Sequence, residues 1–239
     1  MSHRTNWPRS LAQQATKLPG PNSIIVSSCT SPLDAIYLAA IFDPIFTTSY
    51  PTTKLVEHVS LPVFLWRYFT DPTLHPVELT NLISLPELLK KKANCTILLF
   101  PEATPTNGRG ILCFTPALST VPSTTKIFPV SLKYTPADIT TPIPNTYIDF
   151  FWSLLSRPTH CIRVRIAEII YNTDVGVRKV ESFDSEDSSY TVEEEELCRV
   201  CERSSEALAR IGRIKRLNLG IRDKIGFVKA WKGRNNLLD

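Results

Sequence analysis

Short apolar runs alternate with helix-like patterns along most of the chain. The clearest runs are Ser23 to Val26 and Cys95 to Phe100, and the second is continuously apolar, as in a strand covered on both faces. Further strands are expected at residues 46–49, 110–114, 126–133 and 161–167. Because strands interleaved with helices are typical of α/β proteins, the pattern predicts an α/β fold with a mixed, largely parallel sheet flanked by helices.

A helix start follows the first apolar run. Ser31 fits the N-cap, Pro32 the first helical position, and Asp34 the position three residues after the cap, which together predict a capping box. The helix is expected to reach Ile41, and shorter helices are expected at residues 61–69 and 85–92. The capping box therefore gives Asp34 a structural role that requires no catalytic function.

The composition changes beyond Tyr171. Residues 181–206 include ten Asp or Glu against two Arg, whereas residues 207–239 include nine Lys or Arg against two Asp. We therefore expect an N-terminal segment (1–22), an α/β domain (23–171), an acidic loop (172–191) and a charged helical C-terminal region (192–239).

The basic region also has apolar residues at helical spacing, at Leu208, Ile211, Ile214 and Leu217. Such a helix either packs on the domain, which is the favoured interpretation, or lies on an anionic membrane surface.

Composition narrows the function classes. A net charge of +4 without a basic, aromatic patch gives no indication of nucleic-acid binding. No run reaches the roughly 18 apolar residues of a membrane span, and the N-terminus has no apolar signal core, so an intracellular protein without a span in this chain is expected. The six cysteines lack framework spacing, so no disulfides are expected. Cys198-Arg199-Val200-Cys201 has the spacing of half a zinc site, but no second Cys/His pair follows it, so no metal site is expected.

Three short motifs occur in a distinctive order. They are Cys29-Thr30-Ser31-Pro32-Leu33-Asp34, Phe100-Pro101-Glu102-Ala103-Thr104 and Phe128-Pro129-Val130-Ser131-Leu132. Together they resemble the glycerophospholipid acyltransferase family, whose motifs are His-x-x-x-x-Asp, Phe-Pro-Glu-Gly-Thr and a Val-Pro-Val-type strand. The resemblance covers roughly residues 24–170, and the arrangement is similar to that of fungal lysophosphatidic acid:oleoyl-CoA acyltransferase-like proteins.

The resemblance implies that Cys29 and Asp34 occupy the catalytic positions, with Cys29 where the family has its histidine base. A thiol with a reference pKa of about 8.5 is a poor base at neutral pH, and a neighbouring carboxylate raises that pKa further. Cys29 could instead act as a nucleophile if a cation or a base, with His58 and His75 as candidates, lowered its pKa. Alternatively, Cys29 is a small buried residue in a relict site.

The resemblance further implies that Glu102, Thr104 and Ser31 help to bind the acceptor's phosphate-bearing glycerol backbone. Pro105 stands where the family usually has a phosphate-binding arginine, so Arg109 is either its replacement or a solvated turn residue. The family's second-motif arginine is also missing, and the nearest stand-ins are Arg67 and His75.

The implied activity is an acyl-CoA-dependent O-acyltransferase that esterifies a lysophospholipid, converting lysophosphatidic acid to phosphatidic acid. Acyl-CoA would be a co-substrate and no cofactor is implied. The implied location is the cytosol-facing surface of the endoplasmic reticulum or a lipid droplet. The alternative is a catalytically inactive protein of the same fold that binds lipid or acts as a scaffold, because the histidine and both arginines are missing.

Overall fold

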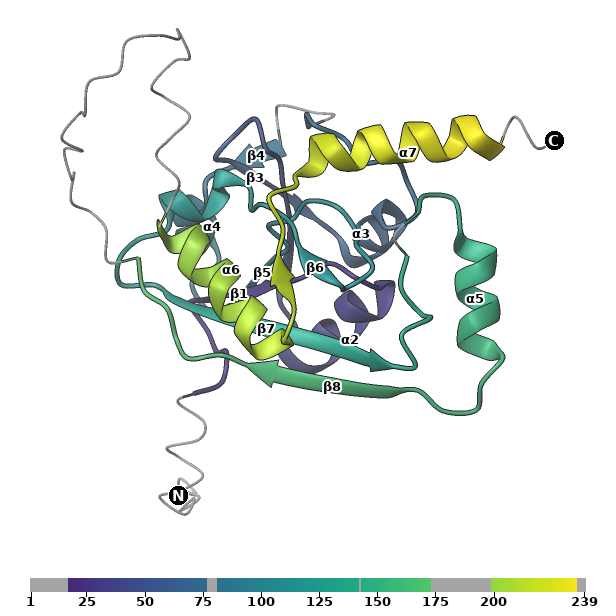
Figure 1. Cartoon of the computed structure of the whole chain (residues 1–239). Helices are drawn as coiled ribbons and strands as arrows, with labels where there is room; N and C mark the ends of the chain where they lie inside the picture. Colours follow the sequence, from purple (N-terminus) through teal and green to yellow (C-terminus); the bar gives the residue numbers. More distant parts are fainter. Residues whose placement is uncertain (1–16, 77–80, 142, 173–198, 236–239) are drawn as a thin grey trace, which may run out of the picture.

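A seven-stranded mixed sheet forms the centre of the computed structural model, which describes residues 17–76, 81–141, 143–172 and 199–235 (Figure 1). The strand order is β4-β3-β2-β5-β1-β7-β8, with β2, β5, β1 and β7 parallel and the other three strands antiparallel to their neighbours. The strands of this sheet are β1 (Ser23–Ser27), β2 (Ile45–Ser49), β3 (Val56–Val59), β4 (Leu82–Ile83), β5 (Ile97–Leu99), β7 (Lys126–Thr135) and β8 (Cys161–Ile166). The predicted mixed α/β fold is confirmed.

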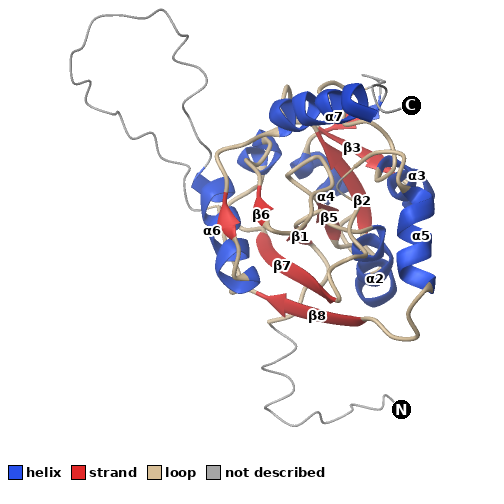
Figure 2. Ribbon diagram, turned by 45° about the vertical axis from the view of Figure 1, so that its right-hand side comes forward, coloured by secondary structure: helices blue, strands red, loops and turns tan. Residues whose placement is uncertain are grey.

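Helices cover both faces of the sheet, which explains the continuous apolar runs. Adjacent residues Ile24 and Ile25 of β1 belong to different apolar clusters, and both side chains are fully buried. The first cluster includes residues of α4 (Leu85–Lys91), the 3-10 helix η2 (Pro116–Thr120) and α6 (Arg199–Gly212). The second includes residues of α2 (Pro32–Phe42) and α3 (Leu61–Arg67), and Figure 2 shows α2 and α6 on opposite sides of the central strands.

The start of α2 has the predicted capping box. The Ser31 Oγ accepts a hydrogen bond from the Leu33 backbone N–H at 3.3 Å, and the Asp34 carboxylate accepts one from the Ser31 backbone N–H at 2.9 Å. These bonds hold the loop from Ser28 to Ser31 in a defined position between β1 and the helix.

The charged C-terminal region forms two helices separated by a short strand, rather than one continuous helix. Val200, Ala207 and Leu208 of α6 are buried against the sheet, so the favoured packing interpretation is confirmed for this helix. The prediction of one helical pattern through Leu217 is wrong, because the helix ends at Gly212 and the chain then forms β9 (Lys215–Arg216). This strand pairs with β6 (Gly110–Ile111), and the final helix is α7 (Ile221–Asn235).

Two further elements, β3 and α5 (Tyr147–Leu155), have no clear signal in the sequence. β3 has only four residues, Val-Glu-His-Val, too few for a convincing alternation. α5 is apolar around most of its circumference, and Phe150 is its buried residue.

Most of the predicted acidic loop lies outside the described residues. Within the described part of the chain, we find no helix that is both long and apolar enough to cross a bilayer.

Candidate functional site

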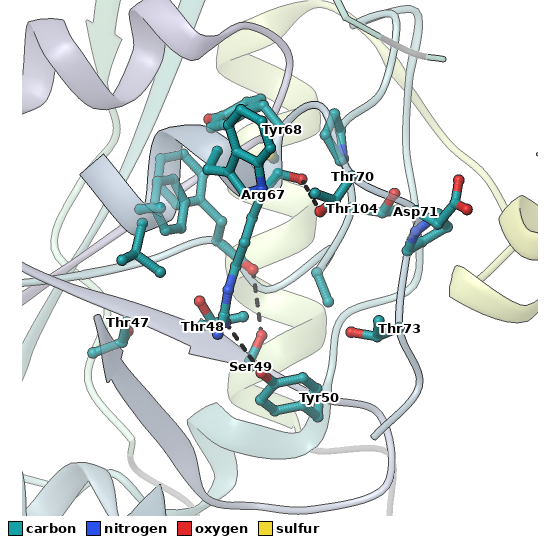
Figure 3. A pocket seen from close by; sticks show the side chains of 18 residues that line it. Thr47, Thr48, Ser49, Tyr50, Arg67, Tyr68, Thr70, Asp71, Thr73 and Thr104 are labelled. Carbon is teal, nitrogen blue, oxygen red and sulfur yellow. Dashed lines mark hydrogen bonds between the residues drawn. The ribbon is translucent and has the colours of Figure 1, made fainter. Parts of the chain in front are cut away.

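The carboxyl ends of three neighbouring parallel strands surround a cavity of about 270 Å³. Open α/β sheets bind ligands at this edge. Cys29 enters from the loop after β1, Thr47 to Tyr50 from the end of β2, and Phe100 to Pro105 from the segment after β5. The remaining wall comes from α3 and the loop that follows it, which contribute Val63, Phe64, Trp66, Arg67, Tyr68, Thr70, Asp71, Pro72 and Thr73 (Figure 3).

The cavity is lined by aromatic rings together with polar side chains. The Phe64 ring stacks on Phe100 with 5.1 Å between centroids and meets the Tyr68 ring edge-on at 5.6 Å. Several threonines, Arg67 and Asp71 line the same cavity (Figure 3). An apolar interior with a few polar groups suits an amphipathic ligand with a chain and a polar head.

Cys29 lines the cavity but remains protonated. Its side chain is only 5% exposed, and burial raises the pKa of the thiol well above its usual range. The carboxyl groups of Asp34 and Glu102 raise this pKa further, and the opposing effects of Tyr68 and Lys224 do not cancel the increase. A resting thiolate is therefore not expected at this position.

Histidine is absent from the described residues that line the cavity. His58 lies on β3 and His75 follows the cavity-lining loop, and both side chains are exposed. The Tyr68 hydroxyl is buried next to Cys29 and has no hydrogen-bond partner of standard geometry among the described residues. Neither sequence-predicted histidine is positioned to activate the thiol.

Asp34 is fully buried, and both of its carboxylate oxygens accept hydrogen bonds from other groups of the protein. One oxygen, Oδ2, accepts hydrogen bonds from the Thr30 backbone N–H at 2.8 Å, the Thr30 hydroxyl at 2.9 Å and the Ser31 backbone N–H. The other, Oδ1, accepts one from the Tyr134 hydroxyl of β7. Burial raises the pKa of Asp34 to about 6 despite these bonds, and Asp34 is not among the residues that line the cavity.

Glu102 also lies behind the cavity wall rather than in it. Its Oε2 accepts a hydrogen bond from the Leu112 backbone N–H at 2.9 Å, while the buried Oε1 has no partner of standard geometry among the described residues. The Cys29 backbone N–H also interacts with this carboxyl group and lowers its pKa. Burial raises the pKa of Glu102 to about 8, so the side chain is mostly a neutral acid at pH 7. Thr104, by contrast, lines the cavity, and its buried hydroxyl has no partner among the described residues.

The backbone of the Phe100-to-Thr104 segment has a conformation that favours glycine at position 103. Ala103 has a φ of 55°, in the left-handed region that glycine adopts without steric cost. An alanine there costs about 1 kcal/mol, because its Cβ crowds the following carbonyl oxygen. The loop nevertheless keeps the conformation, which brings Thr104 to the cavity.

The two candidate arginines lie in different environments. The Arg109 side chain is exposed in a turn and does not line the cavity. Arg67 lines the cavity and donates a hydrogen bond to the Tyr50 hydroxyl at 3.1 Å (Figure 3). It also donates hydrogen bonds to Glu57 at 2.8 and 2.9 Å. The sequence indicated Arg67 only as a weak stand-in, because its partners Glu57 and Tyr50 lie on β3 and after β2.

The raised pKa of Glu102 predicts a specific pH dependence of stability. A carboxyl group whose pKa rises on folding stabilises the fold at low pH, and this contribution is lost as the pH rises through the folded-state value. Between pH 6 and 8, we expect the free energy of unfolding to fall by about 2 to 3 kcal/mol relative to Glu102→Gln. Urea unfolding at several pH values measures this difference.

The exposed Glu168→Gln variant is the matched control and should follow the wild-type curve. Because the Asp34 pKa of about 6 lies at the lower edge of this interval, most of the difference between pH 6 and 8 belongs to Glu102. Parallel curves for wild type and Glu102→Gln would contradict the neutral-acid assignment.

Comparison with known proteins gives one curated relative. No family model matches the chain, and no solved structure matches it. Over 212 residues the chain is 27% identical to a Schizosaccharomyces pombe protein described as "Putative lysophosphatidic acid:oleoyl-CoA acyltransferase". The alignment covers 88% of this chain but 63% of the relative, so the chain spans less than two thirds of that protein's length. The chain is thus a distant homologue of a fission-yeast protein that carries an acyltransferase description.

Proposed function

We propose that this chain is an acyl-CoA-dependent O-acyltransferase that esterifies lysophosphatidic acid. The observation that carries the proposal is the shared cavity: Cys29 and Thr104, from two motifs far apart in the sequence, both line it at the carboxyl ends of parallel strands. The distant relative's description names the same acyl donor and acceptor. The cavity's aromatic rings and its polar side chains are chemically suited to both.

The reaction joins an alcohol to a thioester carbon. The acceptor hydroxyl oxygen attacks the thioester carbonyl, a C–O bond forms, the C–S bond breaks, and CoA leaves as its thiol after taking up the hydroxyl proton through solvent. Because the protonated Cys29 is a poor base, we propose that the rate comes mainly from positioning. Holding the two reactants in the geometry of attack lowers the activation barrier of such a reaction by as much as about 7 to 11 kcal/mol.

The proposal assigns each motif residue a distinct role. Thr104, which lines the cavity and whose buried hydroxyl has no partner among the described residues, hydrogen-bonds the acceptor's glycerol backbone. Ser31 and Asp34 position the Cys29 loop through the capping box, and Glu102 holds the segment after β5 through Leu112. These last three residues are positioning residues, since none of them lines the cavity.

Arg67 is the proposed site for the acceptor's phosphate, being the cation among the described residues that line the cavity. We expect Arg67→Ala to raise KM for lysophosphatidic acid about tenfold or more, because a hydrogen bond to a charged group contributes roughly 1.5 to 3 kcal/mol. KM for a monoacylglycerol, which lacks the phosphate, should change little. Steady-state kinetics with labelled acyl-CoA measures both values.

Arg109→Ala is the competing variant, because the family resemblance implied a phosphate role for that residue. We expect it to leave both KM values near wild type, since the Arg109 side chain is exposed and away from the cavity wall. Arg67→Lys, which keeps the charge but loses the paired donors, should fall in between. A larger effect of Arg109→Ala than of Arg67→Ala would reject the assignment of Arg67.

A second function is favoured by one specific observation. Cys29 is held as a neutral thiol, and Asp34 already accepts four hydrogen bonds, so neither of the two catalytic positions offers a base. A non-catalytic lipid-binding or scaffold protein of the same fold would have this arrangement. Such a protein would bind lysophosphatidic acid and acyl-CoA in the same cavity without forming phosphatidic acid.

A further inference from the structure

α5 presents an exposed row of large apolar side chains. Leu155 is 78% exposed, Trp152 77% and Ile148 69%, and Tyr147 and Phe151 are about half exposed. These residues share one side of the helix, while Phe150 on the other side is buried against Tyr134 and Ile139. A continuous apolar patch of this kind marks an interaction surface rather than ordinary surface scatter.

This apolar row lies beside the mouth of the cavity. Phe69, in the loop that follows α3, contacts the rings of Tyr147 and Phe150, with centroid distances of 6.5 and 5.8 Å. The Asn145 backbone N–H, just before α5, donates a hydrogen bond to the Phe69 carbonyl oxygen at 2.9 Å. Trp66, which lines the cavity, is itself 70% exposed. Apolar surface therefore continues from α5 to the cavity.

α7 reaches the same loop from another direction and adds positive charge. Its Lys232 ammonium forms an ion pair with Asp71, a cavity-lining residue, at 2.7 Å. The helix has two partly exposed aromatic residues, Phe227 and Trp231. Its charged residues are five cations and one anion: Arg222, Lys224, Lys229, Lys232, Arg234 and Asp223. Figures 1 and 2 both show α3, α5 and α7 on one side of the molecule.

We propose that the exposed faces of α5 and α7 dock on an anionic membrane surface. Tryptophan and phenylalanine enter the boundary between headgroups and acyl chains, and Lys or Arg beside them is attracted to anionic lipid. The excess positive charge on α7 disfavours a second copy of this chain as the occupant, because two such helices would repel each other. Docking through this face would place the mouth of the cavity against the membrane, so that a lipid ligand enters the cavity directly from the bilayer.

This inference concerns membrane binding and stands independently of catalysis. Flotation with phosphatidylcholine vesicles, with and without phosphatidic acid, tests it without any turnover. We expect the wild-type chain to bind vesicles containing phosphatidic acid, and added salt should weaken the binding. We expect Trp152→Ser combined with Leu155→Ser to lower the partition coefficient about tenfold or more, since burial of one large apolar side chain contributes roughly 1.5 to 3 kcal/mol.

Leu18→Ser is the matched control. Leu18 is also about half exposed, but it lies beside Ile166 and Ile169, beyond the end of β8 that is remote from α5. This variant should float like wild type, and circular dichroism should show that all variants are folded. Equal flotation of wild type and the double variant would overturn the proposal, as would an equal loss in Leu18→Ser. A wild-type dimer that the double variant converts to a monomer in light scattering would also overturn it, by showing that this face is a self-interface.

Discussion

A Cys29→His variant is expected to form phosphatidic acid about a hundredfold faster than the wild-type chain. A positioned general base contributes roughly 10² to 10⁴ to such reactions, and an imidazole with a pKa of about 6.5 is mostly neutral at pH 7. The cavity of about 270 Å³ in front of Cys29 gives the ring room. We expect the lower end of the range, because Asp34 has no free hydrogen-bonding position with which to orient the ring. Turnover at saturating lysophosphatidic acid and labelled oleoyl-CoA measures the effect.

Cys29→Ala separates this account from a nucleophilic role of the thiol. If Cys29 only occupies space beside the reactants, Cys29→Ala should remain within roughly threefold of wild type. Abolished activity in Cys29→Ala, together with an acylated Cys29 in the intact mass of wild type, would instead establish an acyl-cysteine intermediate. Cys29→His without any gain, in a variant that still binds lysophosphatidic acid, would contradict the claim that a base is what this site lacks.

An Asp34→Ala variant is expected to lower the free energy of unfolding by about 3 to 5 kcal/mol. The substitution removes the acceptor of four buried hydrogen bonds, and each buried donor left unsatisfied costs roughly 1 to 3 kcal/mol. The hydroxyls of Thr30 and Tyr134 can rotate toward other partners, whereas the backbone N–H groups of Thr30 and Ser31 cannot. Urea unfolding at pH 7 measures the loss.

Asp149→Ala is the matched control, since Asp149 is an exposed carboxylate in the first turn of α5. Its effect should stay within about 0.5 kcal/mol, as is usual for surface positions. Asp34→Asn, which keeps one acceptor oxygen, should be less damaging than Asp34→Ala. A loss below about 1 kcal/mol in Asp34→Ala would show that Asp34 is not the structural centre of the loop.

The sequence predicted the elements whose signals are local. The buried strands β1 and β5 are continuous apolar runs, and the start of α2 is encoded within four residues by Ser31, Pro32 and Asp34. α5 was missed because its nine residues place the exposed Trp152 and Leu155 where a surface helix normally has polar residues. The end of the C-terminal pattern was also missed, because pairing of β9 with β6 joins segments about a hundred residues apart.

The candidate site was predictable only in part. Cys29 and Thr104, which come from two of the motifs, both line the cavity, because the neighbouring parallel strands β1 and β5 end at the same edge of the sheet. Sequence alone could not show that Asp34 and Glu102 lie behind the cavity wall, since burial and hydrogen-bond satisfaction depend on residues such as Tyr134 and Leu112. Arg67 had no distinguishing signal, because its environment is created by a strand pair and not by a motif.

Acyl transfer by the wild-type chain is the most direct test of the proposed function. Purified protein is incubated with labelled oleoyl-CoA and lysophosphatidic acid, and phosphatidic acid is separated and counted beside an enzyme-free control. The account predicts protein-dependent formation of phosphatidic acid that is slow in wild type and faster in Cys29→His. Binding of lysophosphatidic acid without any product from wild type, while Cys29→His forms phosphatidic acid, would contradict it and establish a lipid-binding protein that is not itself an acyltransferase.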